Sequence, residues 1–168
     1  MSRADDAIVV NESNIEWDHQ KSPKGVFEIY FKEISGALTA TPRVDDPSGQ
    51  LISRRPFDVE LVRIPPGKKA CPKHSHSAQW EHYIVLSGKG RMVIDDGGID
   101  IRAGDHIIQP PGWAHTVWNN TDQELLYYVI ADNPLAESIY YPDSDKWVVR
   151  PEDKLFRMVK TTYYDGEE

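Results

Sequence analysis

The sequence contains very little cysteine and no long apolar run. Cys71 is the only cysteine in 168 residues, which excludes an internal disulfide and gives no reason to invoke an oxidising compartment. No stretch approaches the roughly 20 consecutive apolar residues that a membrane helix requires. Near the N-terminus only residues 7–10 are apolar before polar residues return. This is not the pattern of a secretory signal, so we expect a cytoplasmic protein.

Basic residues are also in short supply. The chain carries 19 Lys and Arg against 27 Asp and Glu. Nucleic acids and anionic membranes usually select a basic face, so the composition argues against both as partners. A small-molecule ligand remains the expected partner.

Sustained helical periodicity is absent from residues 57–132, and the chain shows no internal repeat or low-complexity tract. Short apolar runs recur there instead, separated by Gly and Pro, which is typical of an antiparallel β-sandwich or barrel. We therefore predict an all-β fold. The length suits one domain, residues 1–168, with an irregular N-terminal arm (1–25), a barrel core (about 57–132) and a C-terminal tail (133–168).

The expected strands follow from alternation and from turn residues. An alternating run begins at Phe27, and residues 40–56 read as a long polar loop. Asp95-Asp96-Gly97-Gly98 predicts a hairpin turn. The tail is rich in aromatic residues and is expected to pack on the barrel or on a second subunit, with a short helix near residues 154–160. The predicted strands of the core are 57–64, 83–86, 91–94, 99–101, 106–109, 114–118 and 125–131.

Histidines and one glutamate form a candidate metal site. On a strand, residues two apart point the same way, so His74 and His76 can bind one ion together. Glu81 lies five residues further on, and His115 follows another hairpin and a Pro-Pro-Gly turn. Three imidazoles and one carboxylate suit one divalent transition metal ion (Fe, Mn, Ni, Cu, Co or Zn) rather than Ca²⁺ or Mg²⁺, which prefer oxygen ligands. Four protein ligands would leave positions open for water, O₂ or a substrate.

Two spaced motifs contain these residues. Six residues separate Gly67 from His74-x-His76, four more precede Glu81, and six follow before Gly88. The second motif is Gly104, five residues, Pro110-x-Gly112, two residues, His115, three residues and Asn119. The two motifs follow one another in this order and contain all four candidate ligands. They resemble the two motifs of the cupin superfamily, except that one extra residue lies between Gly67 and His74.

The resemblance implies a small jelly-roll β-barrel with the metal inside near its wider mouth, and often a homodimer. A homodimer is therefore expected here. A further likeness is to small bacterial cupins of unassigned function. It rests on residues 61–67 and on residues 133–147, which contain Tyr141-Pro-Asp-Ser-Asp-Lys146.

Residue parity extends the candidate site. It places Tyr83 on the side of Glu81, where it could orient a substrate or donate a proton, although it could equally be a core aromatic. His82 falls on the other side. If Phe57, Val59, Leu61 and Arg63 face the interior, Arg63 becomes an inward cation that could hold a carboxylate or phosphate. The alternative is a rim arginine paired with a surface acid.

The remaining histidines are weaker candidates. His19 belongs to the arm, and His106 occupies an ordinary strand position. Cys71 is interpreted as a small buried side chain rather than a ligand.

Three functions are compatible with such a pocket. The first is a metal-dependent enzyme acting on a small organic acid or aromatic compound, for example an Fe(II) dioxygenase, and we favour it because the metal would carry the chemistry. The second is a sugar or sugar-phosphate isomerase or epimerase, which needs a general base beside the metal and cations for phosphate. The third is a non-catalytic binding module. The fold alone does not choose among them.

Overall fold

The computed structural model describes residues 9–37, 56–151 and 154–168. The predicted polar loop at 40–56 therefore lies outside the described residues except for Pro56. None of the helical segments in the described ranges is long and apolar enough to span a membrane. The helical elements are η2 (Glu12–Asn14) and α1 (Ile34–Ala37). The strands are β1 (Asp18–Lys21), β2 (Glu28–Glu33), β3 (Phe57–Ile64), β4 (Ser75–His76), β5 (Glu81–Ser87), β6 (Lys89–Ile94), β7 (Gly97–Arg102), β8 (His106–Gln109), β9 (His115–Trp118), β10 (Leu125–Asp132), β11 (Glu137–Tyr141), β12 (Lys146–Arg150) and β13 (Lys154–Phe156).

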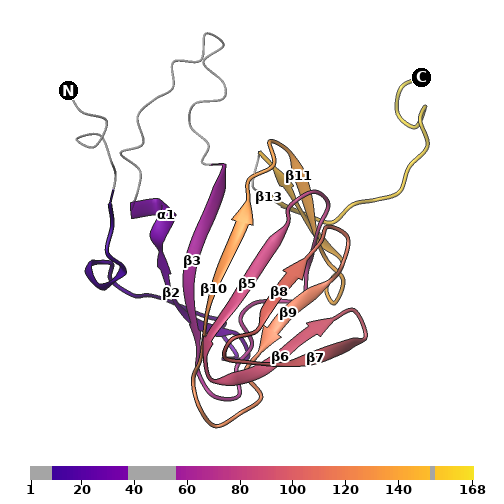
Figure 1. Ribbon diagram of the computed structural model, residues 1–168. Coiled ribbons are helices and arrows are strands. Elements are labelled where there is room, and N and C mark those ends of the chain that lie inside the picture. Colours follow the sequence, from indigo (N-terminus) through magenta and orange to yellow (C-terminus); the bar gives the residue numbers. More distant parts are fainter. Residues whose placement is uncertain (1–8, 38–55, 152–153) are drawn as a thin grey trace, which may run out of the picture.

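One layer of the barrel is a six-stranded antiparallel sheet in the order β1-β2-β3-β10-β5-β8 (Figure 1). β10 occupies its centre and pairs along its full length with β3. On its other side β10 pairs with β5, with a register irregularity between Leu126 and Tyr127. The predicted all-β antiparallel architecture is confirmed.

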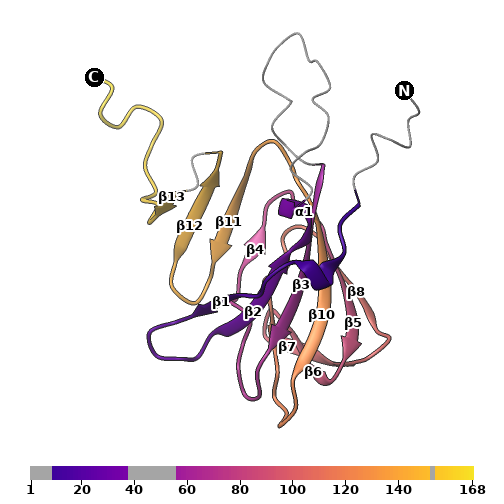
Figure 2. The same cartoon turned by 90° about the vertical axis from the view of Figure 1, so that its left-hand side faces the viewer.

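The opposite layer consists of two smaller sheets, β7-β6-β9 (Figure 1) and β13-β12-β11-β4 (Figure 2). They meet where His74 and His115 exchange backbone hydrogen bonds, with N···O distances of 3.1 and 2.8 Å. Lys69 forms bridges both to Phe27, at the start of β2, and to Trp118, at the end of β9. The segment between Lys69 and His76 thus links the two layers and brings two of the candidate ligands to the junction.

The hydrophobic core lies between the layers. The six-stranded sheet contributes buried residues of β3, β10 and β5, and the opposite layer contributes residues of β6, β7 and β9. The buried core residues are Val62, Ile64, Tyr83, Val85, Met92, Ile101, Val117, Leu125 and Tyr127. Tyr83 and Val85 lie on the inner face, as residue parity predicted. Ile29 and Phe31 of β2 pack against this core, which extends it to the strand that follows the arm.

The prediction that Phe57, Val59, Leu61 and Arg63 face the interior is wrong. Val62 and Ile64 belong to the core, so the opposite parity of β3 faces outward. The sequence does not reveal which residues of β3 face inward, because both faces of this strand are covered. Leu61 is only 4% exposed although it lies outside the main core, so apolar residues occur on both parities.

The hairpin predicted at residues 95–98 is present between β6 and β7, with a positive φ of 47° at Asp95. Gly88, at the turn before β6, has a φ of +81°, and a Cβ there would lie 2.2 Å from the carbonyl oxygen of Glu124. Both the backbone conformation and the close approach require glycine at position 88.

The ends of the chain are more regular than predicted. Part of the expected irregular arm forms β1, which pairs with β2. The tail forms β11 to β13, and β11 pairs with β4, so it does pack on the barrel. The prediction of a short helix near residues 154–160 is wrong, because Lys154–Phe156 is strand β13 and the following residues are irregular. Cross-strand pairing with β12 decides this segment rather than local helical preference.

Candidate metal centre

The four predicted ligands come from segments that meet at the junction of the two layers. His74 immediately precedes β4, and His76 lies within it. Glu81 is the first residue of β5 and His115 is the first residue of β9. Backbone pairing of His74 with His115 fixes these two positions side by side. Residues separated by up to 41 positions in the sequence therefore reach one place because their strands begin there.

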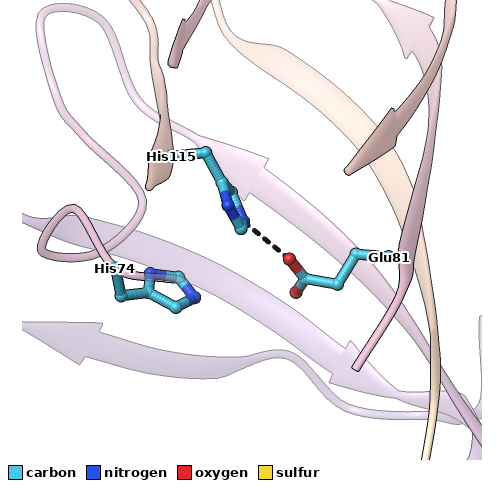
Figure 3. Close-up of side chains that lie close together, drawn as sticks. All are labelled: His74, Glu81 and His115. Carbon is cyan, nitrogen blue, oxygen red and sulfur yellow. Dashed lines mark ion pairs between the residues drawn. The ribbon is translucent and has the colours of Figure 1, made fainter. Parts of the chain in front are cut away.

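The side chains of His74, Glu81 and His115 converge (Figure 3). Each offers one ligand atom, and these atoms all lie within 4.8 Å of one another. The Nε2 atom of His115 lies 2.6 Å from Oε2 of Glu81. His76 is adjacent, with Nε2 3.9 Å from Oε1 of Glu81. The structure thus brings all four predicted side chains together, with His76 slightly outside the tight group of three.

Each of the three histidines has its Nδ1 atom fixed by an acceptor. Nδ1 of His74 lies 3.0 Å from the carbonyl oxygen of Pro72, and Nδ1 of His115 lies 3.1 Å from that of Trp113. Carbonyl oxygens only accept, so in both cases Nδ1 carries the proton. Nδ1 of His76 lies 3.1 Å from Oε2 of Glu137.

This arrangement leaves Nε2 of each ring as the atom available to a ligand. Metal-binding histidines commonly have their second ring nitrogen held in this way. The donor set of three imidazoles and one carboxylate therefore fits a divalent transition metal ion.

The electrostatics of the centre is dominated by Glu81 and its histidines. Burial alone would raise the pKa of Glu81, but the hydrogen bond and charge of His115, aided by His76 and His74, lower it to about 2. Burial lowers the pKa of His74 to about 4, and the neighbouring His115 adds to this effect. Although burial opposes it, the Glu81 carboxylate raises the pKa of His115, so a metal ion that binds there would have to displace a proton. Ionised Glu81 and neutral His74 are already in the state that binds metal.

Tyr83 and Gln109 flank Glu81. The Tyr83 hydroxyl lies 3.2 Å from Oε2 of Glu81 and 3.3 Å from Nε2 of His115. Burial, with the Glu81 charge, raises the Tyr83 pKa well above its ordinary value, so this hydroxyl stays protonated. Gln109 pairs with Glu81 across β5 and β8, and so lies on the same face.

Gln109 is 1% exposed, and neither its amide nitrogen nor its amide oxygen has a hydrogen-bond partner among the described residues. An orphaned buried carboxamide is costly. It indicates a position that a polar ligand would satisfy. Sequence reasoning missed Gln109, although its position directly before the Pro110-x-Gly112 motif was a usable signal.

Several sequence candidates lie away from the centre. Arg63 stacks between Trp17 and Tyr30, at 4.6 and 4.7 Å from their ring centroids, on the outer face of β3. The prediction that Arg63 is an inward cation is therefore wrong. Its side chain packs against Trp17 of the N-terminal arm instead. Its Nε lies 3.7 Å from a carboxylate oxygen of Glu124, which matches the rim alternative.

The other histidines also lie elsewhere. His82 and His106 contact each other on the outer face, with Nε2 and Nδ1 3.1 Å apart. His19 is in β1 and pairs with Glu28. Cys71 lies closer to the centre, with Sγ 3.6 Å from Nδ1 of His74, but burial raises the pKa of its thiol to about 12. A protonated thiol is a poor metal ligand, which agrees with the expectation that Cys71 is not a ligand, although the residue is half-buried rather than buried.

Glu137 is the other residue that sequence reasoning missed. Its side chain is fully buried and contacts His76 and Arg150. Nothing in the local sequence pairs Glu137 with a histidine 61 positions earlier.

The comparison with known families agrees with the geometry. The model of the cupin domain family matches residues 60–131, a range that contains all four predicted ligands. Residues 60–131 are therefore a cupin domain.

Individual relatives show how far this likeness extends. The oxalate-binding protein of Thermotoga maritima is 37% identical over 73 residues, which are 41% of this chain and 58% of that protein. The chain spans about half the length of the curated relatives it matches. Any activity of those whole proteins therefore does not transfer directly.

Solved structures support the fold over more of the chain. A sugar phosphate isomerase of the cupin superfamily from Silicibacter pomeroyi aligns with a TM-score of 0.71 and 24% identity, covering 93% of the present chain and 98% of that one. A predicted oxalate decarboxylase from Thermotoga maritima aligns with a TM-score of 0.57 and 20% identity, covering 76% and 100%. At these identities the likeness shows the fold alone.

Proposed function

We propose that this cupin binds one divalent transition metal ion through His74, His76, Glu81 and His115, and that it is an enzyme acting on a small organic acid held at that ion. The observation that carries the proposal is the arrangement of the imidazoles. Each has Nδ1 fixed by an acceptor and Nε2 available beside the Glu81 carboxylate. Such a donor set serves Fe, Mn, Ni, Cu, Co or Zn.

The bound ion supplies Lewis acidity, and redox chemistry if it is iron, manganese or copper, at positions that the four side chains leave open. The neighbouring residues act on the substrate. The Tyr83 hydroxyl, protonated because it is buried, is a neutral donor beside Glu81. The Gln109 carboxamide offers both a donor and an acceptor on the same face. Together they favour a small molecule with oxygen substituents.

The charges around the centre favour a small acid over a phosphate ester. Among the described residues, the charged groups that act on the pKa of Glu81 are histidines, not Lys or Arg. Arg63 faces outward, and Arg150 is paired with the Glu137 carboxylate. A phosphate group would need a cation beside the ion, whereas a small carboxylate can bind the ion itself. The name of the oxalate-binding relative is in keeping with a small acid as ligand.

For the reaction we favour oxidation by O₂, of the dioxygenase type. This chemistry asks little of the surrounding side chains, because it needs a redox-active ion and a positioned substrate. Tyr83 and Gln109 provide the positioning. The described residues therefore suffice for this class of reaction without a dedicated phosphate site.

One observation favours a second candidate, an isomerase or epimerase. Glu60 lies on the same face of β3 as Val62 and Ile64, and burial, together with the charges of Glu33, Asp58 and Glu81, raises its pKa to about 6. A carboxylate with a pKa near neutrality is suited to moving a proton. Glu60 would be the general base in that reaction.

Oxygen consumption separates these functions. Metal-free protein would be loaded anaerobically with Fe(II) or Zn(II) and tested in an oxygen electrode with oxalate, 2-hydroxy acids, 2-oxo acids and phenols. We expect one class of acid to drive O₂ uptake with Fe(II), no uptake with Zn(II), and none with Fe(II) in His115→Ala. Sugar-phosphate turnover that is lost in Glu60→Gln would establish the isomerase instead. Tight oxalate binding with no turnover of any kind would make the protein a binding module.

We also propose that the protein is a homodimer. The outer face near β5 and β8 exposes Trp80, Leu86 and Ile108, with 51, 40 and 52% of their surface accessible. Apolar side chains gathered on one sheet face suit an interface with a second copy. Sedimentation velocity would show a species of twice the chain mass, and a monomer at micromolar concentration would contradict the proposal.

A further inference from the structure

Glu137 connects the C-terminal strands to the candidate metal centre. It is the first residue of β11, and its side chain is 0% exposed. Both carboxylate oxygens face Nδ1 of His76, at 3.3 and 3.1 Å. Arg150 approaches Oε1 at 3.2 Å, and the backbone N–H of Gln79 donates to Oε2 at 3.3 Å. A fully buried carboxylate with three such donors is rigidly held.

The strand register explains how these groups meet. β11 lies between β4 and β12. Ile139 pairs with His76 on one side, and Glu137 pairs directly with Arg150 on the other. The hairpin of β11 and β12 thus delivers an acid and its cation together to the back of His76. Both residues lie outside the range 60–131 that the cupin domain family matches.

His76 differs from the other two histidines in how its ring is fixed. The acceptors of His74 and His115 are carbonyl oxygens two residues earlier in the chain. The backbone next to each of these histidines therefore supplies the acceptor that fixes its ring. His76 instead depends on a side chain 61 residues away. Without that carboxylate, either ring nitrogen of His76 could carry the proton, and the ring could rotate.

We propose that Glu137 is a positioning residue of the metal centre, held by Arg150, which fixes the Nδ1–H tautomer of His76 and directs its Nε2 toward Glu81. The inference rests on the proposed metal site. It assigns the C-terminal hairpin a role in metal affinity. Loss of such a hydrogen-bonded partner typically weakens metal binding by about 10–100-fold.

The test uses the full-length protein in metal-free and metal-loaded form. Glu137→Met removes the acceptor at similar size, and Glu137→Gln keeps one acceptor oxygen. Glu28→Met is the matched control, because Glu28 is also buried and also contacts a histidine, His19 at 3.2 Å, outside the centre. Zn(II) affinity would be measured by competition with a chromophoric chelator, and ¹⁵N NMR of the metal-free protein would report the tautomer of His76.

We expect Glu137→Met to weaken Zn(II) binding by about 10–100-fold and to give a mixture of His76 tautomers. Glu137→Gln should retain the Nδ1–H tautomer and most of the affinity, and Glu28→Met should bind like wild type. Wild-type affinity or an unchanged His76 spectrum in Glu137→Met would overturn the inference. If Glu137→Met does not fold, Arg150→Met is measured in its place. We expect this variant to bind Zn(II) more weakly than wild type, and an unchanged affinity would overturn the positioning role of Glu137.

The two proposals fail in different ways. A wild-type protein that binds no metal would refute the proposed function. The His76 tautomer in wild type and in Glu137→Gln would still be measured without metal. A wild type that binds metal normally alongside an unaffected Glu137→Met would refute the positioning role alone.

Discussion

A Glu60→Gln variant should be more stable than the wild type above pH 6. Glu60 is half-buried on the inner face of β3, and burial raises its pKa from 4.5 to about 6, with further contributions from the negative charges of Glu33, Asp58 and Glu81. The folded state therefore binds the Glu60 proton more tightly than the unfolded state does. Ionising this carboxylate works against folding, and the glutamine variant removes that cost.

The pH window follows from the two pKa values. Below pH 4.5 the carboxyl is protonated in both states, so it does not favour unfolding. Between 4.5 and about 6 the unfolded state releases the proton first, and the wild type loses stability as the pH rises. Above 6 the loss is complete. A shift of 1.5 units corresponds to about 2 kcal/mol, which is an upper value because Glu60 is partly in contact with solvent.

Urea unfolding followed by tryptophan fluorescence at pH 4 and pH 8 measures this effect. We expect the two proteins to agree at pH 4 and Glu60→Gln to exceed wild type by about 1–2 kcal/mol at pH 8. Glu16→Gln, at an exposed position, is the control and should match wild type at both pH values. If Glu60→Gln is no more stable than wild type at pH 8, the ionised Glu60 carboxylate does not work against folding and this prediction is refuted.

Three further predictions concern packing. Leu125→Ala should lower the free energy of unfolding by about 2–5 kcal/mol in urea, because Leu125 is 0% exposed in the core. Gly88→Ala should cost about 2 kcal/mol or more in the same assay, because its φ is +81° and its Cβ would meet the Glu124 carbonyl oxygen at 2.2 Å. Arg63→Ala should cost about 1 kcal/mol through lost stacking on Trp17, while its Zn(II) affinity in the chelator assay stays that of the wild type.

Matched variants make these predictions specific. Gly97→Ala, where the nearest atom to a new Cβ is 3.8 Å away, and Val159→Ala, at an 86% exposed side chain, should each change stability by less than about 0.5 kcal/mol. A Gly88→Ala variant as stable as Gly97→Ala would contradict the backbone argument. Loss of metal affinity in Arg63→Ala would contradict the outward orientation of that side chain.

The barrel could be predicted from local signals, whereas the set of four ligands was predicted from the two spaced motifs that resemble those of cupins. Strand alternation and turn residues place the starts of β5, β8 and β9 within two residues of their observed positions, and Glu81 and His115 are the first residues of β5 and β9. The spacing of His74 and His76 follows from the strand period alone. Strand period and turn residues need no knowledge of distant contacts.

The errors arise where tertiary packing decides. The parity of β3 could not be assigned from Leu61 and Arg63, because the arm covers the outer face and makes both parities partly buried. β11 pairs with β4, which lies far earlier in the sequence, and β13 forms only through cross-strand pairing with β12. The local pattern near residues 154–160 does not reveal this pairing and favoured a helix instead. The contact of Glu137 with His76 depends on the pairing of β11 with β4 and was equally out of reach.

We propose that His74, His76, Glu81 and His115 together hold one metal ion. The most direct measurement is the metal content of protein purified without added metal or affinity nickel, compared with His76→Ala, His115→Ala and the outer-face control His106→Ala. We predict about one ion per chain in wild type and in His106→Ala, and little metal in the other two variants. Circular dichroism should show that all of them fold, because apolar side chains rather than the ion build the core. Stoichiometric metal in His76→Ala or His115→Ala, or a wild type that takes up none when the metals are offered, would contradict the account.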